Sequence, residues 1–346
     1  MDSFLRLSDA QRLQLLRSAG EDLGVAPEAV EKDFWVCWVL RELFALPVLA
    51  HHLSFKGGTS LSKCWKSISR FSEDIDLVID RGSFGIAGDL APEAAASNSE
   101  RKRRVKHVRE ACACFVLGRV RSDLNAQIGS RLPSELLWNL TKDEAEPDEP
   151  TLLFQYPRLA GEGGYLRREV RIELGARSDT EPSATCSVQP FVADAAGLVI
   201  HGANFEVRAV APERTFWEKV LCLHEETHRK TPLGRRLSRH FYDIVQLQHS
   251  GVAARAIADG VLGARVASHR RLYFPKNQQM QGAMHPGTLR LVPLPEDMKV
   301  WRSDFETMRD SMFIGNAPRF DDLMTAVAAL EIAVNASVWP HAASPA

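Results

Sequence analysis

Apolar residues recur at every third or fourth position along several stretches of the chain, and this spacing is typical of helices. The earliest stretch begins at Pro27, a residue that suits the first turn of a helix, and runs to Leu43. Further helical patterns cover residues 101–128, 213–226, 238–249, 252–262 and 320–336. The chain beyond Pro212 is therefore predicted to be mostly helical.

Strict alternation of apolar and polar residues marks other stretches, and this period of two predicts strands with one buried face. In residues 71–80, Ile75 and Leu77 fall on one face while Asp74 and Asp76 fall on the other. A second alternating strand is predicted at residues 168–174, and shorter strands are predicted at 151–156, 187–192 and 205–210.

A chain of 346 residues exceeds the usual size of a single hydrophobic core, so two domains are expected. Strands mixed with helices up to residue 211, followed by helices alone, indicate an α+β protein. We predict that residues 1–211 form a domain with a mixed sheet and N-terminal helices, and that residues 212–346 form a helical C-terminal domain.

The balance of charges excludes one class of protein. The chain has 43 Lys and Arg against 44 Asp and Glu, whereas a protein that coats nucleic acid over its whole surface is strongly basic. No apolar run approaches the roughly 18 residues of a membrane span, and no secretory signal is visible, so we expect a cytoplasmic location without membrane contact. The six cysteines form no Cys-x-x-Cys pair, and we interpret them as free thiols of a reducing compartment.

The segment 56–63 (Lys-Gly-Gly-Thr-Ser-Leu-Ser-Lys) combines two adjacent glycines with the start of a predicted helix. Glycines let backbone amides approach a ligand closely, and the first turn of a helix offers free N–H groups, so the segment suits phosphate oxygens. It is not a Walker A loop, because the second Gly-Lys-Ser/Thr is missing. An ordinary glycine turn before a helix is the alternative interpretation.

Asp74 and Asp76 lie two residues apart on a predicted strand, so both carboxylates leave the same face. Two carboxylates this close repel each other unless a cation lies between them, and hard oxygen ligands favour Mg²⁺. Glu173, on the second alternating strand, could complete a site for two metal ions if the two strands pair. Glu169 points the same way and is the rival, and solvated acids on an exposed sheet face are the alternative.

Lys219 falls within the apolar stripe of the helix predicted at 213–226. A buried lysine needs a partner, so it either extends to solvent along its stem or reaches an anionic ligand such as a triphosphate. On the next helix, Arg239, His240 and Asp243 cluster, where an Arg239–Asp243 pair is the structural alternative. The basic run 101–109 could contact RNA phosphates or could simply be a solvated helix face.

These motifs together resemble the AbiEii/AbiGii-type nucleotidyltransferases, toxins of bacterial toxin–antitoxin and phage-defence systems with the fold of the DNA polymerase β superfamily. The resemblance is carried by the string 56–63 with Arg-Phe-Ser-Glu-Asp-Ile-Asp-Leu at 70–77. It extends to residues 30–36, 212–219, 238–243 and to patterns between 304 and 335. The joint match is specific although each piece alone is weak, and it implies a polymerase β-like nucleotidyltransferase domain before the helical one.

The resemblance implies a role for each matching residue. Gly58 with Thr59 or Ser60 corresponds to the Gly-Ser that grips a triphosphate, and Lys219 corresponds to a lysine that contacts the nucleotide. The implied nucleotide-binding set is Gly57, Gly58, Thr59, Ser60, Lys63, Lys219 and Asp243. The implied catalytic set is Asp74, Asp76, Glu173 and Lys219, of which the three acids would bind two Mg²⁺ ions.

Two departures from the family pattern are visible. The gap between Thr59 and Asp74, residues 60–73, is slightly long for the wider superfamily, and Arg239-His240 stands where many relatives have Lys-Asp. The leading hypothesis is metal-dependent transfer of a nucleotide from an NTP to an RNA acceptor, for which the resemblance implies the tRNA 3′ end. It also implies an antitoxin with a winged-helix DNA-binding domain. The alternatives are nucleotidylation of a protein or small molecule, and a toxin that binds NTP without chemistry.

Overall fold

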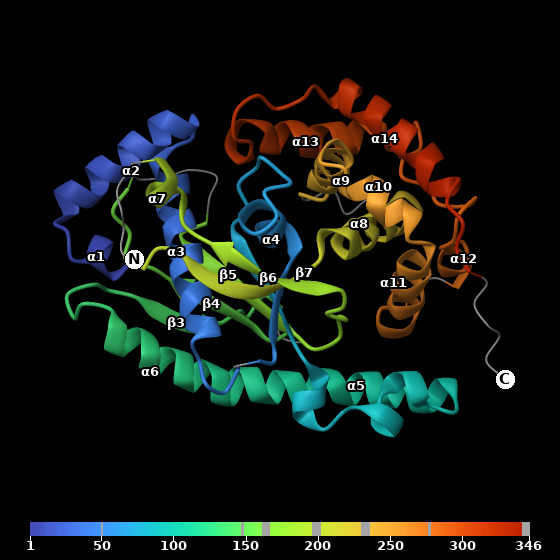
Figure 1. Cartoon of the computed structure of the whole chain (residues 1–346), viewed down its shortest axis with the longest axis horizontal. Coiled ribbons are helices and arrows are strands. Elements are labelled where there is room, and N and C mark those ends of the chain that lie inside the picture. The colour runs from blue at the N-terminus through green and yellow to red at the C-terminus, as the bar shows by residue number, and fades with distance from the viewer. Residues whose placement is uncertain are drawn as a thin grey trace. The chain divides into compact units, whose positions relative to one another are not determined.

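The computed structural model describes residues 1–49, 51–146, 149–160, 167–195, 202–229, 236–275 and 278–340 (Figure 1). The chain divides into two compact units, Met1–Val210 and Ala211–Ala346. This division lies one residue before the boundary predicted from the sequence.

Within the described residues, seven strands of unit 1 form one mixed sheet in the order β3-β4-β5-β2-β1-β7-β6. Two of its neighbouring pairs, β2 with β5 and β1 with β7, are parallel, and the other pairs are antiparallel. The mixed sheet confirms the predicted α+β class. The strands are β1 (Leu53–Lys56), β2 (Asp74–Ile79), β3 (Asn139–Lys142), β4 (Thr151–Gln155), β5 (Glu169–Gly175), β6 (Ser183–Val188) and β7 (Phe205–Val210).

Helices supply the remaining secondary structure of unit 1. These are α1 (Asp2–Leu5), α2 (Asp9–Leu23), α3 (Pro27–Phe44), α4 (Gly57–Lys63), α5 (Asn98–Phe115), α6 (Arg121–Arg131) and α7 (Phe191–Ala195), with short 3₁₀ turns at Arg81–Phe84, Gly88–Leu90 and Pro92–Ala94. A π-helical turn, Val116–Val120, joins α5 to α6, so the three segments run on as one long rod beside the sheet (Figure 1).

The core of unit 1 lies between this sheet and the helices α3, α5 and α6. Ile75 and Leu77 of β2 are buried in the same apolar cluster as Trp38 of α3 and Val108 of α5. Alternation then requires Asp74 and Asp76 to leave the opposite face of β2, and both side chains are only partly buried. The apolar pattern of β2 therefore fixes the direction in which its two aspartates point.

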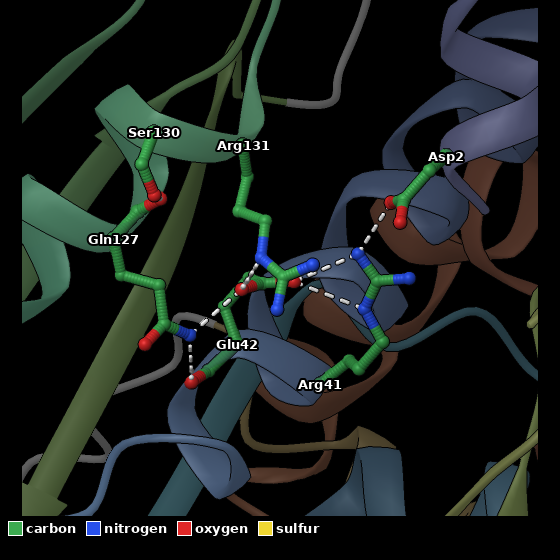
Figure 2. Close-up of polar contacts among 6 residues, drawn as sticks. All are labelled: Asp2, Arg41, Glu42, Gln127, Ser130 and Arg131. Carbon is green, nitrogen blue, oxygen red and sulfur yellow. Dashed lines mark hydrogen bonds and ion pairs between the residues drawn. The ribbon is translucent and has the colours of Figure 1, made fainter.

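A polar cluster fastens the C-terminal half of α3 to α1 and α6 (Figure 2). Glu42, only 1% exposed, accepts hydrogen bonds from the guanidinium of Arg41 at 2.7 Å and from the side-chain amide of Gln127 at 2.7 Å. Arg41 in turn donates to Asp2 at 2.6 Å, and Arg131 lies 3.8 Å from Glu42. Each buried charge of this cluster is therefore paired.

Unit 2 is helical in its described part, as the sequence predicts. Its helices are α8 (Pro212–Thr227), α9 (Arg239–His249), α10 (Val252–Ala258), α11 (Gly260–Tyr273), α12 (Gln278–Gly282), α13 (Met298–Met312) and α14 (Phe320–Asn335). Pro212 occupies the first turn of α8, and a buried bidentate ion pair between Glu225 and Arg270 joins α8 to α11. The single helix predicted at 252–262 is instead divided at Asp259, whose side chain caps α11.

Two sequence-based predictions are wrong for unit 1. The strand predicted at 187–192 lies at Ser183–Val188, and α7 begins at Phe191. Cys64 and Cys186 form a disulfide, with Cα atoms 5.5 Å apart, rather than being free thiols. They are 122 residues apart in the sequence, and the folded chain brings the end of α4 next to β6. Cys37, Cys112, Cys114 and Cys222 are not disulfide-bonded.

None of the helices in the described ranges is both long enough and apolar enough to span a bilayer.

Candidate active site

The register of the sheet surrounds Asp76 with the other predicted site residues. Its Cα partner on β1 is Lys56, the residue directly before Gly57, and its Cα partner on β5 is Glu173. Asp74 stands opposite Arg171 in the same parallel ladder. The pairing of the two alternating strands, on which the Glu173 hypothesis depended, is therefore present, whereas Glu169 lies before the first paired position.

Gly57 lets the diglycine segment approach the carboxylate of Asp76 closely. Its φ is +77°, in the left-handed region that favours glycine, and a Cβ added there would lie 1.8 Å from Oδ2 of Asp76. No side chain fits in that space, so the residue type is fixed by both its backbone and its neighbour. The start of α4 is consequently in contact with the acidic face of β2.

The next residues of the segment are held by β2 and by the loop before it. The Thr59 hydroxyl donates to the main-chain oxygen of Asp74 at 2.5 Å, and the Ser60 hydroxyl donates to the Gly57 oxygen at 3.0 Å. A Cβ at Gly58 would lie 2.6 Å from a guanidinium nitrogen of Arg70. Arg70 is buried, and its place in the motif string 70–77 was the one sequence signal that could have indicated its role.

Glu173 pairs with Arg171 across the same face of β5. Its carboxylate accepts from Arg171 Nε at 2.8 Å, and Arg171 also contacts Asp143 and Glu146. Burial lowers the pKa of Arg171, but the hydrogen bond to Glu173 and the neighbouring acids outweigh this and raise it above its ordinary value. Glu173 remains 44% exposed. Arg171 was also missed, although its spacing of two residues from Glu173 was a usable signal.

Among the described residues, no three His, Cys, Asp or Glu side chains are grouped closely enough to hold a metal ion. The chemistry of the donors nevertheless fits a hard divalent cation, because Asp74, Asp76 and Glu173 offer carboxylate oxygens on neighbouring strands. Glu173, paired with Arg171, would have to turn from that partner to join the two aspartates.

Lys63, predicted to bind nucleotide, is 7% exposed at the end of α4. Its ammonium lies 2.5 Å from Oδ1 of Asp33 and 3.2 Å from the ring centroid of Phe191. The structure thus directs this charge toward α3 and α7, where its positive charge is neutralised.

Lys219 and Asp243 form a buried pair within unit 2. Lys219 Nζ lies 2.8 Å from Oδ2 of Asp243, and their side chains are 8% and 0% exposed. Nδ1 of His240 lies 3.3 Å from the same ammonium. Because an ammonium can only donate, this ring nitrogen accepts when Lys219 is charged, and His240 then carries its proton on Nε2. Lys219, within the apolar stripe of α8, thus pairs with an anionic side chain of α9 and does not extend to solvent.

The residues of the basic run lie on α5, and some of them are committed to the local fold. Arg104 donates to Glu100 and to the oxygens of Asp89 and Ala91. The more exposed members of the run are Lys102, Arg103, Lys106 and His107.

A family model, described as the nucleotidyl transferase AbiEii toxin of a type IV toxin–antitoxin system, matches residues 38–326. The chain belongs to the AbiEii family. It is thus a toxin nucleotidyltransferase, and an antitoxin partner is implied by the family's description. The match covers most of both units, so it includes the diglycine segment 56–63, the aspartates of β2 and the pair formed by Lys219 and Asp243.

Among solved structures, this AbiEii chain is similar to MenT4, a nucleotidyltransferase toxin from Mycobacterium tuberculosis H37Rv. The two are 18% identical, the alignment covers 94% of this chain and 99% of the other, and the TM-score is 0.34. A search of curated proteins finds no match.

Proposed function

We propose that this AbiEii protein transfers a nucleotide from an NTP to an RNA acceptor, with the tRNA 3′ end as the leading acceptor. The observation that carries the proposal is the position of Asp76. It stands between Lys56 and Glu173 in the sheet, with Gly57 packed against its carboxylate. A phosphate cradle and paired carboxylates at one place are what phosphoryl chemistry requires, because charge must be neutralised where the oxygens react.

In this proposal Asp74, Asp76 and Glu173 would hold two divalent cations, with Mg²⁺ as the expected ion. When bound, these ions would lower the pKa of the attacking hydroxyl and neutralise charge on the triphosphate. The amides of Gly58, Thr59 and Ser60, at the start of α4, bind phosphate oxygens. The hydroxyl attacks the α-phosphate, its proton passes to the carboxylate of Glu173, and pyrophosphate leaves.

We assign Lys219 to the charge of the triphosphate, the role that the family resemblance implies, and Asp243 to holding that lysine in place. The 2.8 Å pair supports the second assignment. Replacing Lys219 with alanine removes the positive charge, so the affinity for NTP is expected to fall. Lys219→Arg, which keeps the charge, is expected to recover part of that affinity. Equal NTP affinities for the wild type and Lys219→Ala would remove the lysine from the nucleotide site.

An RNA acceptor is supported by the exposed positive charges of α5, namely Lys102, Arg103 and Lys106. Lys106 lies 3.5 Å from Glu110 and Arg103 lies 3.7 Å from Glu100, so both pairs are at the surface and weak. Contacts of this kind with phosphates weaken as salt is added. The proposed location is the cytoplasm, where tRNA is found, and the proposed biological setting is defence against phage.

The test is to incubate the purified protein with labelled NTPs, Mg²⁺ and total RNA, and to ask which molecule carries the label. Label on tRNA is expected. Label on protein or on a small molecule would show that the acceptor is not RNA. NTP binding without transfer of label to any molecule would favour a toxin that sequesters nucleotide.

Asp76→Asn is the variant that tests the chemistry. It removes one negative charge from the paired carboxylates, so transfer should fall by about a hundredfold or more while the fold is retained. Circular dichroism and thermal unfolding check the fold. Transfer at the wild-type rate by a folded Asp76→Asn would contradict the metal site.

A further inference from the structure

Three consecutive charged residues, Glu31, Lys32 and Asp33, lie in the N-terminal half of α3 and are at most 4% exposed. The residues around them on α3 are apolar and equally buried, so each charge must be paired there. Buried ion pairs seldom stabilise a fold more than apolar side chains of the same volume would, so their presence calls for a reason other than stability. What each charge is attached to gives that reason.

Lys32 ties together the starts of the two strands that carry the acids. Its ammonium lies 2.5 Å from Oε2 of Glu73 and donates to the main-chain oxygen of Arg167 at 2.9 Å. Glu73 directly precedes Asp74 on β2, and Arg167 lies just before β5, the strand of Glu173. Both partners of the ion pair have side chains 2% exposed. One ammonium therefore links the entry points of two neighbouring parallel strands.

Asp33 holds the other half of the site. Its Oδ1 lies 2.5 Å from the ammonium of Lys63, and its Oδ2 accepts from the Phe191 N–H at 2.7 Å. Lys63 is the last residue of α4 and also donates to the Gln189 oxygen at 3.3 Å. The far end of the phosphate cradle is thereby fixed to α3 and to the start of α7.

We propose that Lys32 and Asp33 are positioning residues for nucleotidyl transfer: Lys32 sets the carboxylate strands, and Asp33, acting through Lys63, sets the phosphate cradle. The inference rests on the proposed function, because it names what these two segments are held in place to do. It also moves Lys63 from the nucleotide-binding set to a positioning role. Glu31 has a separate task, since it accepts the Leu159 and Ala160 N–H groups.

The test compares Lys32→Met and Asp33→Asn with Glu42→Gln. Glu42 is a matched control because it is a buried, multiply paired acid on the same helix, in the cluster of Figure 2 that touches neither segment. Three measurements are made on each full-length variant. They are thermal unfolding, peptide-resolved hydrogen exchange without ligands, and the affinities for Mn²⁺ alone and for an NTP alone.

The expected result is local. Asp33→Asn should speed exchange at residues 57–63 by about tenfold or more and weaken NTP binding, with residues 73–76 little changed. Lys32→Met should instead speed exchange at residues 73–76 and weaken Mn²⁺ binding, with residues 57–63 little changed. Glu42→Gln should lower the melting temperature without either local effect. Equal loosening of unit 1 by all three variants, or unchanged exchange at both segments, would overturn the proposal.

Double variants keep the test decisive if a single change unfolds the chain. Asp33→Asn with Lys63→Met and Lys32→Met with Glu73→Gln remove both charges of a pair, which costs far less stability than removing one. Local loosening should persist in these folded doubles, and full recovery of exchange protection would overturn the proposal. A wild type that binds neither Mn²⁺ nor NTP would overturn the proposed function, whereas exchange without ligands would still decide what Lys32 and Asp33 hold.

Discussion

At the scale of the residue, the alternation of β2 and β5 was enough to predict which carboxylates share a face. A period of two leaves no other arrangement once Ile75 and Ile172 enter the core. The partners of Lys63, and those of Arg171 other than Glu173, were beyond that logic. Asp33 lies on a different helix from Lys63, and the Arg171 that binds Glu173 is itself held by Asp143 from beyond the end of β3. Only the folded chain brings these charges together.

Glu173→Gln tests the third carboxylate against its rival on the same strand. Loss of this charge should reduce transfer by about a hundredfold, because the proton of the attacking hydroxyl then has no carboxylate to accept it. Glu169→Gln, earlier on the same face of β5, is the control and should retain activity. Initial rates with labelled NTP measure both, and the opposite ranking would exchange the two roles.

At the scale of the element, long segments with a clear hydrophobic period were predicted well, whereas an edge strand of the sheet was misplaced. The predicted helix 27–43 and strand 205–210 match α3 and β7 to within a residue. The strand β6 was misplaced because it is an edge strand of small side chains, of which only Val188 is fully buried, so there is little alternation to detect. The helix α13 was not predicted at all, although Trp301 and Phe305 are buried and stand one helical turn apart.

Substitution of Gly57, at the start of α4, tests the close approach to Asp76. Gly57→Ala places a Cβ 1.8 Å from a carboxylate oxygen of Asp76 and adds a side chain at a φ of +77°. We expect NTP binding and transfer to be lost, with about 1 to 3 kcal/mol of stability.

Gly129→Ala is the matched substitution within α6. A Cβ there meets only Trp138 at 3.6 Å, so stability should rise by up to about 1 kcal/mol with activity unchanged. Urea unfolding and nucleotide titration of both variants give the comparison. An active Gly57→Ala would show that the cradle does not need this close approach.

The buried His224 of α8 should make the stability of unit 2 depend on pH. Burial is the main cause that lowers its pKa from 6.5 to about 4, and the positive charges of His228 and Arg290 act in the same direction against the Met280 carbonyl. The pKa of His228 is also lowered, mainly by burial. Between pH 6.5 and pH 4 the unfolded chain therefore binds more protons than the folded chain. The free energy of unfolding is highest above pH 6.5 and falls as the pH drops toward 4.

His224→Gln should be less stable than the wild type at pH 8 but should lose less stability between pH 7 and pH 4.5. A shift of this size corresponds to at most about 3 kcal/mol. His249→Gln, at an exposed position on α9, should keep the wild-type slope. Urea unfolding across this pH range measures the slopes, and an unchanged slope in His224→Gln would assign the effect to other groups.

At the scale of the whole molecule, the change from mixed strands and helices to helices alone was readable because the hydrophobic period itself changes near Pro212. The disulfide between Cys64 and Cys186 was not readable, since a separation of 122 residues carries no signal in a single sequence.

Removing this disulfide should destabilise unit 1, because the crosslink restricts the unfolded chain. We expect Cys186→Ser to lower the free energy of unfolding by about 2 to 4 kcal/mol. Cys114→Ser, at an exposed free thiol, should have no effect. Chemical unfolding under oxidising conditions provides the numbers, and mass mapping of non-reduced peptides checks the bond. Equal stabilities of all three proteins would contradict the crosslink.

The ladder between β1 and β2 has a consequence for how far this design tolerates change. Lys56 and Asp76 are neighbours across that ladder, so the diglycine turn and the aspartates meet whatever the length of the connection between them. Only the turn at residues 65–69, which lies outside the contacts assigned above, is thus expected to tolerate a change of length without disturbing the chemistry. The ladder itself therefore does not require a fixed number of residues between the two motifs.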